Sequence, residues 1–234
     1  MTPTRSGSGA KPPAPRGVDD FLEEVARRPP ARPEGRGRLL FALDATASRQ
    51  PTWDLACELQ ARMFDAAATL GGLDLRLCFF RGFGEFRRSD WKRDATALRD
   101  AMTRVRCAAG RTQIERVLRL ALEETREKRI QALVYVGDCM EEDADRLCGL
   151  AGDLGLLGTP MFIFHEGQDP LAAATFQQMA RASGGACADF DAGAASRLEA
   201  LLSAVAVYAA GGRTALEDFA RRTPAAAGLL EDLR

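Results

Sequence analysis

The chain has 234 residues, and 46% of them are hydrophobic, which is enough for one sizeable folded domain with tails. Its formal net charge is −1 at neutral pH, so the composition gives no support to a protein that binds nucleic acid through its overall charge. No segment approaches the roughly 20 apolar residues that a bilayer-spanning helix needs.

The six cysteines form no C-x-x-C pair, and most of them fall within apolar segments. We interpret them as reduced, buried thiols of a cytosolic protein, with a soft-metal site or a disulfide framework as the alternative. The first residues contain no apolar signal core. We therefore expect a soluble protein in the cytoplasm, without a membrane or nucleic-acid partner.

The first 35 residues differ in composition from the remainder of the chain. Residues 1–17 are rich in Pro, Gly, Ser and basic side chains, which is typical of disordered segments. Apolar residues at helical spacing predict a short helix over 18–28. We expect this segment (1–35) to precede a folded domain over 36–212, with a C-terminal helix and tail over 213–234.

From residue 38 onward, short apolar runs alternate with segments of helical periodicity. Buried strands are predicted at 38–44, 73–82, 131–138, 159–165 and 185–190, with an antiparallel edge strand at 84–91. Helices are predicted at 52–70, 93–106, 113–128, 141–155, 172–183 and 194–209, and a last turn or two at 213–222. This alternation indicates an α/β fold with a mostly parallel sheet that helices cover on both faces.

Polar side chains gather at the predicted strand ends. Asp44 ends the first strand and is followed by Thr46 and Ser48; Asp138 ends a later strand, and Thr112 stands where a helix begins. In open parallel sheets, functional groups collect beyond the carboxyl ends of the strands, where the strand order reverses. Carboxylates and hydroxyls are oxygen donors that suit a hard divalent cation such as Mg²⁺. A cation held mainly by neutral groups would attract an external carboxylate.

This pattern resembles the metal-ion-dependent adhesion site (MIDAS) of the von Willebrand factor A (VWA) family, written D-x-S-x-S, then a distant T, then a distant D. The resemblance covers about residues 36–210. It implies a three-layer, doubly wound sheet of order 3-2-1-4-5-6 with one antiparallel edge strand. It also implies a protein-interaction module in which Asp44, Thr46, Ser48, Thr112 and Asp138 hold Mg²⁺, or Mn²⁺ or Ca²⁺, and a partner supplies an acidic side chain.

The sequence departs from the family pattern at two positions. Thr46 replaces the usual first serine, which keeps the hydroxyl and adds a methyl group. Arg111 precedes Thr112, where its charge would repel a cation if it pointed inward and would bind an acidic ligand from the rim if it pointed outward. A degenerate site is therefore the first alternative, in which the same groups hydrogen-bond one another and hold the loops without metal.

Other interpretations remain beside the metal site. Thr112 and Glu115 have the spacing of a helix capping box. A Mg²⁺-dependent hydrolase would use Asp44 as nucleophile, but Thr46 stands where such enzymes place a general acid, so we expect no enzyme. His165, the only histidine, is interpreted as a loop anchor, with a place on the ligand rim as the alternative.

Two further segments have plain structural interpretations. The acidic residues of 138–146 lack the spacing of a calcium-binding loop and suit the first turn of the following helix. The aromatic and basic residues of 79–88 suit a hairpin whose edge strand carries charges that oppose aggregation.

Overall fold

The computed structural model describes residues 37–53, 73–93, 104–190 and 203–210, together with residues 215, 218, 219 and 221. The predicted disordered segment and short helix before residue 37 lie outside these residues, as do most of the helices expected at 52–70 and 93–106 and the end of the C-terminal tail. The domain boundaries therefore stay predictions.

The described strands form one six-stranded sheet of order β3-β2-β1-β4-β5-β6. All neighbouring strands are parallel except β2 and β3, which form the antiparallel hairpin at one edge. This confirms the predicted fold class, including the strand order and the single antiparallel edge strand. The strands are β1 (Gly37–Asp44), β2 (Leu73–Arg81), β3 (Glu85–Arg88), β4 (Ala132–Gly137), β5 (Met161–Glu166) and β6 (Ala186–Phe190).

The described helices follow the predicted periodicity closely. They are α4 (Ile114–Glu127), α5 (Ala144–Leu156) and α6 (Pro170–Ala182), with residues 203–210 also helical and a 3-10 helix, η1 (Ala47–Thr52), directly after β1. The side chains of Asp143 and Asp169 accept backbone hydrogen bonds at the starts of α5 and α6 and so fix where these helices begin. Within the described segments, no helix has the length and apolar character required to cross a bilayer.

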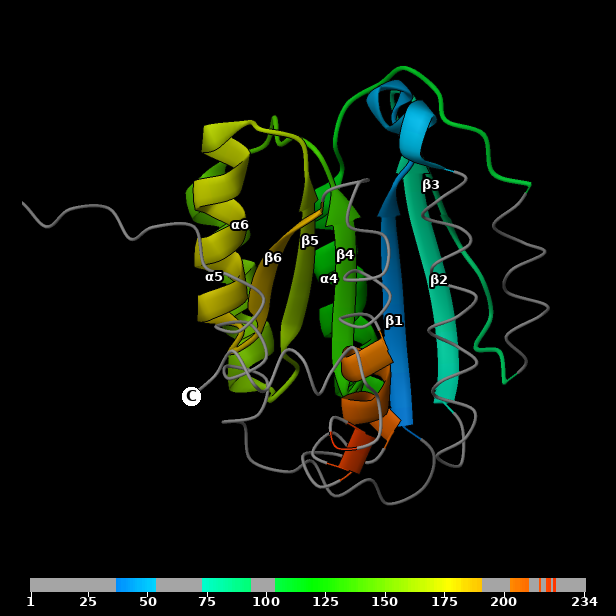
Figure 1. The fold of residues 1–234 in the computed structure, drawn as a ribbon, viewed down its shortest axis with the longest axis vertical. Coiled ribbons are helices and arrows are strands. Elements are labelled where there is room, and N and C mark those ends of the chain that lie inside the picture. The colour runs from blue at the N-terminus through cyan, green and yellow to red at the C-terminus, as the bar shows by residue number, and fades with distance from the viewer. Residues whose placement is uncertain are drawn as a thin grey trace, which may run out of the picture.

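The sheet lies between helices (Figure 1), and an apolar core fills the space on each of its faces. Helices α4, α5 and α6 pack on one face, against side chains such as Leu40 and Tyr135, and the helical residues 203–210 pack on the other, against side chains such as Phe41 and Val134. Since both faces are covered, every residue of β1 is buried. Polar groups at the carboxyl end of β1 are therefore shielded from water.

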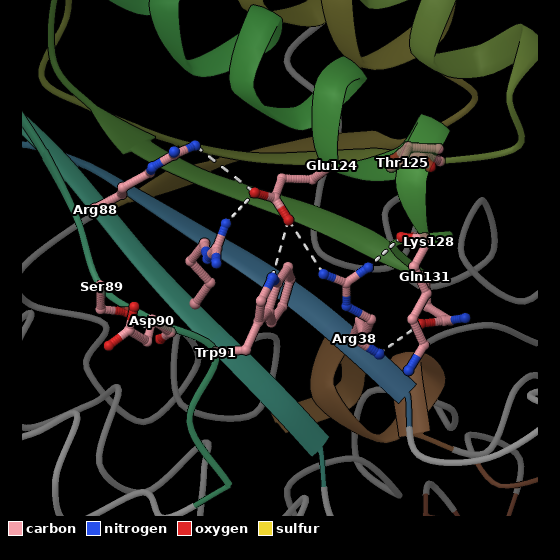
Figure 2. A network of polar contacts seen from close by, with 11 residues as sticks. Arg38, Arg88, Ser89, Asp90, Trp91, Glu124, Thr125, Lys128 and Gln131 are labelled. Carbon is pink, nitrogen blue, oxygen red and sulfur yellow. Dashed lines mark hydrogen bonds and ion pairs between the residues drawn. The ribbon is translucent and has the colours of Figure 1, made fainter.

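The buried carboxylate of Glu124 binds α4 to the end of the sheet opposite the carboxyl ends of the parallel strands (Figure 2). Glu124 Oε2 accepts hydrogen bonds from Arg38 Nη2 at 3.1 Å and from Trp91 Nε1 at 2.9 Å. Arg76 binds Glu124 Oε1, and the Arg38 guanidinium lies 3.8 Å from the centre of the Trp91 ring. This cluster fixes the end of α4 over β1 and β2, so the start of α4 is held at the carboxyl edge where the predicted site lies.

Candidate metal centre

The two strand-end aspartates lie where the order of the strands reverses. β1 pairs with β2 on one side and with β4 on the other, and all three are parallel. Asp44 is the last residue of β1, and Asp138 directly follows β4. Because neighbouring parallel strands end at the same edge of a sheet, the two side chains meet at the position predicted for a ligand site.

The segment after β1 folds around the carboxylate of Asp44. The backbone N–H of Thr46 donates to Asp44 Oδ1 at 2.8 Å, and the hydroxyls of Thr46 and Ser48 are hydrogen-bonded at 3.1 Å. Asp44 and Thr46 are buried, whereas Ser48, on η1, is exposed. The D-x-T-x-S motif thus gathers one carboxylate and two hydroxyls, of which Ser48 faces solvent.

The second strand end adds a carboxylate and a thiol. Ligand atoms of Asp44, Asp138 and Cys139 all lie within 4.8 Å of one another. Asp44 Oδ2 and Asp138 Oδ1 are buried and have no hydrogen-bond partner among the described residues. Leaving a buried polar atom unpaired costs about 1–3 kcal/mol, and more for a charged group. A divalent cation would satisfy both oxygens at once, so these residues fit the metal that the motif implies.

Burial also controls the ionisation of this cluster. It raises the pKa of Asp44 from 3.8 to about 6; hydrogen bonds from Thr46 oppose the shift, and the charge of Asp138 adds to it. Burial, followed by the charges of Asp138 and Asp44, raises the pKa of Cys139 to about 12. A bound cation would reverse these preferences, because it favours the charged form of every ligand.

Thr112 is connected to the loop that follows Asp138. Its Oγ1 accepts a hydrogen bond from the backbone N–H of Glu141 at 3.1 Å, and its own N–H donates to Glu141 Oε2 at 3.1 Å. The side chain is buried. The two loops are therefore held together at the carboxyl edge, and the hydroxyl retains a free lone pair for a further interaction.

The capping-box interpretation of Thr112 is wrong. The N-cap residue of α4 is Gln113, whose side chain makes no capping hydrogen bond. The carboxylate of Glu142 takes that role instead, accepting from the N–H of Ile114 at 2.7 Å and of Glu115 at 2.8 Å. The acidic residues after β4 therefore contribute to two helices. Glu142 caps α4, whereas Asp143 and Asp145 lie at the start of α5.

Arg49 is a residue of this site that the sequence analysis missed. It is fully buried, and its Nε forms an ion pair with Glu166 Oε2 at 2.5 Å. Its Nη1 donates to the carbonyl oxygens of Val136 at 3.1 Å and Asp44 at 3.3 Å. The side chain thus joins the carboxyl ends of β1, β4 and β5 directly beneath the cluster. No spacing rule finds such a residue, because its partners come from distant segments.

The two predicted rim residues lie in different environments. Arg111 is exposed. His165 is 2% exposed, its Nε2 lies 3.3 Å from the carbonyl oxygen of Asp138, and its ring packs edge-on against Phe176. His165 therefore has the contacts of a residue that anchors the loop after β4, and its side chain is buried beneath the rim of the site.

A shallow pocket lies beside Arg111, at the turn between β2 and β3. Its volume is about 450 Å³, and it is lined by Gly82, Phe83, Gly84, Arg111, Gln113 and Arg116. Phe83, in the turn of this hairpin, is 87% exposed. The turn is held against the start of α4 by hydrogen bonds from Arg111 N to Gly82 O at 3.2 Å and from Arg116 Nη1 to Gly84 O at 2.9 Å.

No protein-family profile matches the sequence, and no curated protein matches it significantly. Solved structures do match its fold. The VWA domain of SpRpn10 is 14% identical, with a TM-score of 0.56, over 74% of this chain and 94% of that domain. The pilus adhesin SpaC from Lactobacillus rhamnosus GG is 12% identical, with a TM-score of 0.59, over 79% of this chain and 30% of the adhesin.

A third match has an occupied metal site. Proximal thread matrix protein 1 from the mussel byssus, described with a zinc-occupied MIDAS motif, is 14% identical, with a TM-score of 0.57. The match covers 74% of this chain and 46% of that protein. Together with the strand order, these matches show that the chain has the von Willebrand factor A fold, and the Asp44–Asp138–Cys139 group at its switch point is compatible with a MIDAS-like site.

Proposed function

We propose that this chain is a protein-interaction module that binds an acidic side chain of a partner through a divalent cation. The ligands would be Asp44, Thr46, Ser48, Thr112 and Asp138. The observation that carries the proposal is the pair of buried carboxylate oxygens, Asp44 Oδ2 and Asp138 Oδ1, which belong to one cluster and have no hydrogen-bond partner among the described residues. Natural proteins rarely leave two such atoms unsatisfied in one place, so the pair indicates a ligand.

The surroundings of the site support an acidic partner. Arg111 directly precedes Thr112 and is exposed on the rim, where its guanidinium can pair with a carboxylate in two parallel hydrogen bonds. Phe83 projects from a turn that is fixed to the same helix start. A partner segment that carries an acidic residue beside an apolar one would contact both side chains while it reaches the cation.

The site suits binding rather than catalysis. Position 46, two residues after Asp44, holds a threonine, which cannot act as a general acid near neutral pH. The matched structures include an adhesin and a matrix protein. We accordingly expect no turnover. A cytoplasmic location also stays a prediction, supported by the reduced thiols of Cys78, Cys107, Cys139 and Cys148.

Isothermal titration calorimetry with Mg²⁺ and Mn²⁺ tests the proposal directly. The wild type should bind one ion, and Asp138→Ala should not. Asp145→Ala is the matched control, because Asp145 is an exposed acid in the first turn of α5, close in sequence and outside the cluster. The proposal fails if the wild type binds no divalent ion, or if Asp138→Ala binds as tightly as the control.

A metal-free VWA scaffold is the alternative, and Arg49 is the observation that favours it. Its buried positive charge lies against the carbonyl oxygen of Asp44 and lowers the pKa of the Asp44 carboxyl, so it supplies part of the charge that a cation would bring. The two functions differ in their response to chelators. Partner capture that is unchanged in excess EDTA would favour the scaffold, whereas capture lost in EDTA and restored by Mn²⁺ would favour the metal-dependent module.

A further inference from the structure

We infer that the thiol of Cys139 is a direct ligand of the cation, so that the site selects a borderline or soft divalent ion, of the Zn²⁺ class, over Mg²⁺. This inference rests on the proposed metal site and concerns which ion occupies it. The resemblance to the VWA family implies oxygen ligands only. The cysteine that follows Asp138 is a feature of this chain.

The geometry brings the sulfur atom to the two carboxylates. Donor atoms of Asp44, Asp138 and Cys139 lie within 4.8 Å of one another. An ion about 2.0–2.2 Å from a carboxylate oxygen and about 2.3 Å from a thiolate sulfur, in the tetrahedral geometry of zinc, holds its donors roughly 3.4–3.6 Å apart. The three donors would therefore have to approach one another by about 1 Å at most to share one ion.

The carboxylates themselves point to a ligand at this position. Asp44 is fully buried, and its Oδ2 has no hydrogen-bond partner among the described residues. Asp138 Oδ1, the other unpaired oxygen, belongs to the residue next to Cys139. The thiol thus lies beside these two carboxylates and hydrogen-bonds with the side chain of Asp138, rather than being packed in an apolar core as Cys78 is.

The chemistry of the donors then decides the ion. Thiolates bind Zn²⁺ and Cd²⁺ strongly and contribute little to Mg²⁺ or Ca²⁺, which prefer oxygen. On binding, the Cys139 S–H bond breaks, the sulfur–metal bond forms from the thiolate electron pair, and the proton passes to solvent. No oxidant or reductant is required, and one proton is released for each ion bound through sulfur.

Cys107 provides a matched control within the same region. Its thiol is partly buried, and the charges of Asp44 and Asp138 affect its pKa, so it lies near the cluster. Its sulfur is nevertheless absent from the group of donors that could share an ion. Cys107→Ser removes a nearby thiol and leaves the proposed donor set intact, whereas Cys139→Ser removes the donor with nearly the same side-chain volume.

The experiment is a titration of the full chain with CdCl₂, followed by the ultraviolet charge-transfer absorption of the cadmium–thiolate bond. The wild type and Cys107→Ser should develop the band with one equivalent of Cd²⁺, and Cys139→Ser and Asp138→Ala should not. Changes to groups that only orient a metal ligand lower affinity about 10- to 100-fold, so Cys139→Ser should lose at least roughly tenfold in Cd²⁺ and Zn²⁺ affinity. Its Mg²⁺ affinity should change far less.

Two results would overturn the inference. One is a band of equal strength in Cys139→Ser. The other is calorimetric binding of Cd²⁺ that depends on Asp138 but produces no band in the wild type; the proposed metal site would then survive with oxygen ligands alone. Binding of no divalent ion by the wild type would refute the site and the thiol ligand together, so the two failures are distinguishable.

A measurement on the wild type alone covers the case in which a variant fails to fold. Iodoacetamide modifies exposed thiols, and peptide mass spectrometry reports the rate at Cys139 separately from the other cysteines. Saturating Cd²⁺ should slow modification of Cys139 at least roughly tenfold, as expected for a direct ligand. Equal rates at Cys139 with and without Cd²⁺ would also overturn the inference.

Discussion

Replacing Asp44 by asparagine should stabilise the metal-free protein at neutral pH and abolish its response to metal. Burial raises the pKa of Asp44 from 3.8 to about 6. Between these values the folded protein binds the proton more tightly than the unfolded chain does, so the free energy of unfolding falls as pH rises from about 4 to about 6. Above pH 6 the loss is complete and amounts to about 3 kcal/mol, because one pKa unit corresponds to about 1.4 kcal/mol.

Asparagine removes this charge and preserves the local hydrogen bond. Its side-chain oxygen can still accept from the N–H of Thr46, which lies 2.8 Å from Asp44 Oδ1. Its amide group would occupy the position of Oδ2, in the cluster that also contains the carboxylate of Asp138. Allowing for imperfect geometry, we expect Asp44→Asn to raise the free energy of unfolding by about 1–3 kcal/mol, or the melting temperature by roughly 2–10 °C.

Urea unfolding in EDTA at pH 7.5 and at pH 5 measures this effect. At pH 5 the advantage of Asp44→Asn should be roughly half as large, since the folded wild type then keeps Asp44 mostly protonated. A divalent ion at 100 times its dissociation constant should stabilise the wild type by about 2.7 kcal/mol and leave the stability of the variant unchanged. The difference in stability between the two proteins should therefore shrink or change sign.

The control for this experiment is Asp145→Asn, an exposed acid whose replacement should change stability by less than about 0.5 kcal/mol at either pH. A variant that is less stable than the wild type in EDTA at pH 7.5 would refute the reasoning. A stabilisation of the same size at both pH values would refute the assigned cause, because ionisation of Asp44 could then not be its origin.

Three further substitutions test other contacts of the site. Arg49→Met should lower the free energy of unfolding, measured in urea, by about 3–5 kcal/mol, because it leaves a carboxylate at the end of β5 unpaired; an unchanged midpoint would contradict the ion pair. Arg111→Glu should weaken Mn²⁺-dependent binding of a glutamate-rich peptide, followed by fluorescence anisotropy, roughly tenfold, and equal affinity would remove Arg111 from the ligand rim. Gly110→Ala should destabilise the chain by about 1–3 kcal/mol in thermal unfolding, since a Cβ there would lie 2.0 Å from Gly82 O. Gly149→Ala, in α5 with open space around it, should not destabilise, and equal losses for both would show that the close approach of the two loops does not matter.

Much of the fold could be predicted from local patterns. The apolar run that ends in Asp44 is a strand buried on both faces, and the alternation of such runs with amphipathic helices leads to the parallel sheet. The antiparallel edge strand predicted at 84–91 corresponds to β3, which forms a hairpin with β2. These patterns succeed because side-chain periodicity directly reflects which faces of an element are buried.

The helix starts were less predictable. The spacing of Thr112 and Glu115 satisfies a capping box, yet the cap of α4 comes from Glu142. A local motif competes with any carboxylate that the fold brings to the same N–H groups, and here the carboxylate of Glu142, from the loop after β4, accepts their hydrogen bonds. Of the helix expected at 93–106, most lies outside the described residues, but residues 104–106 are not helical, and Ala108 forms an isolated bridge with Thr46.

By itself the sequence determined the fold class, the strand ends and the identity of the oxygen donors, because these follow from composition and spacing within single elements. Only the tertiary structure decided which loops meet. It placed the buried Arg49 against three strand ends, Cys139 beside Asp44, and Glu142 on the start of α4. These contacts join residues far apart along the chain, and their energies depend on burial and charge at one edge of the sheet, which no spacing rule encodes.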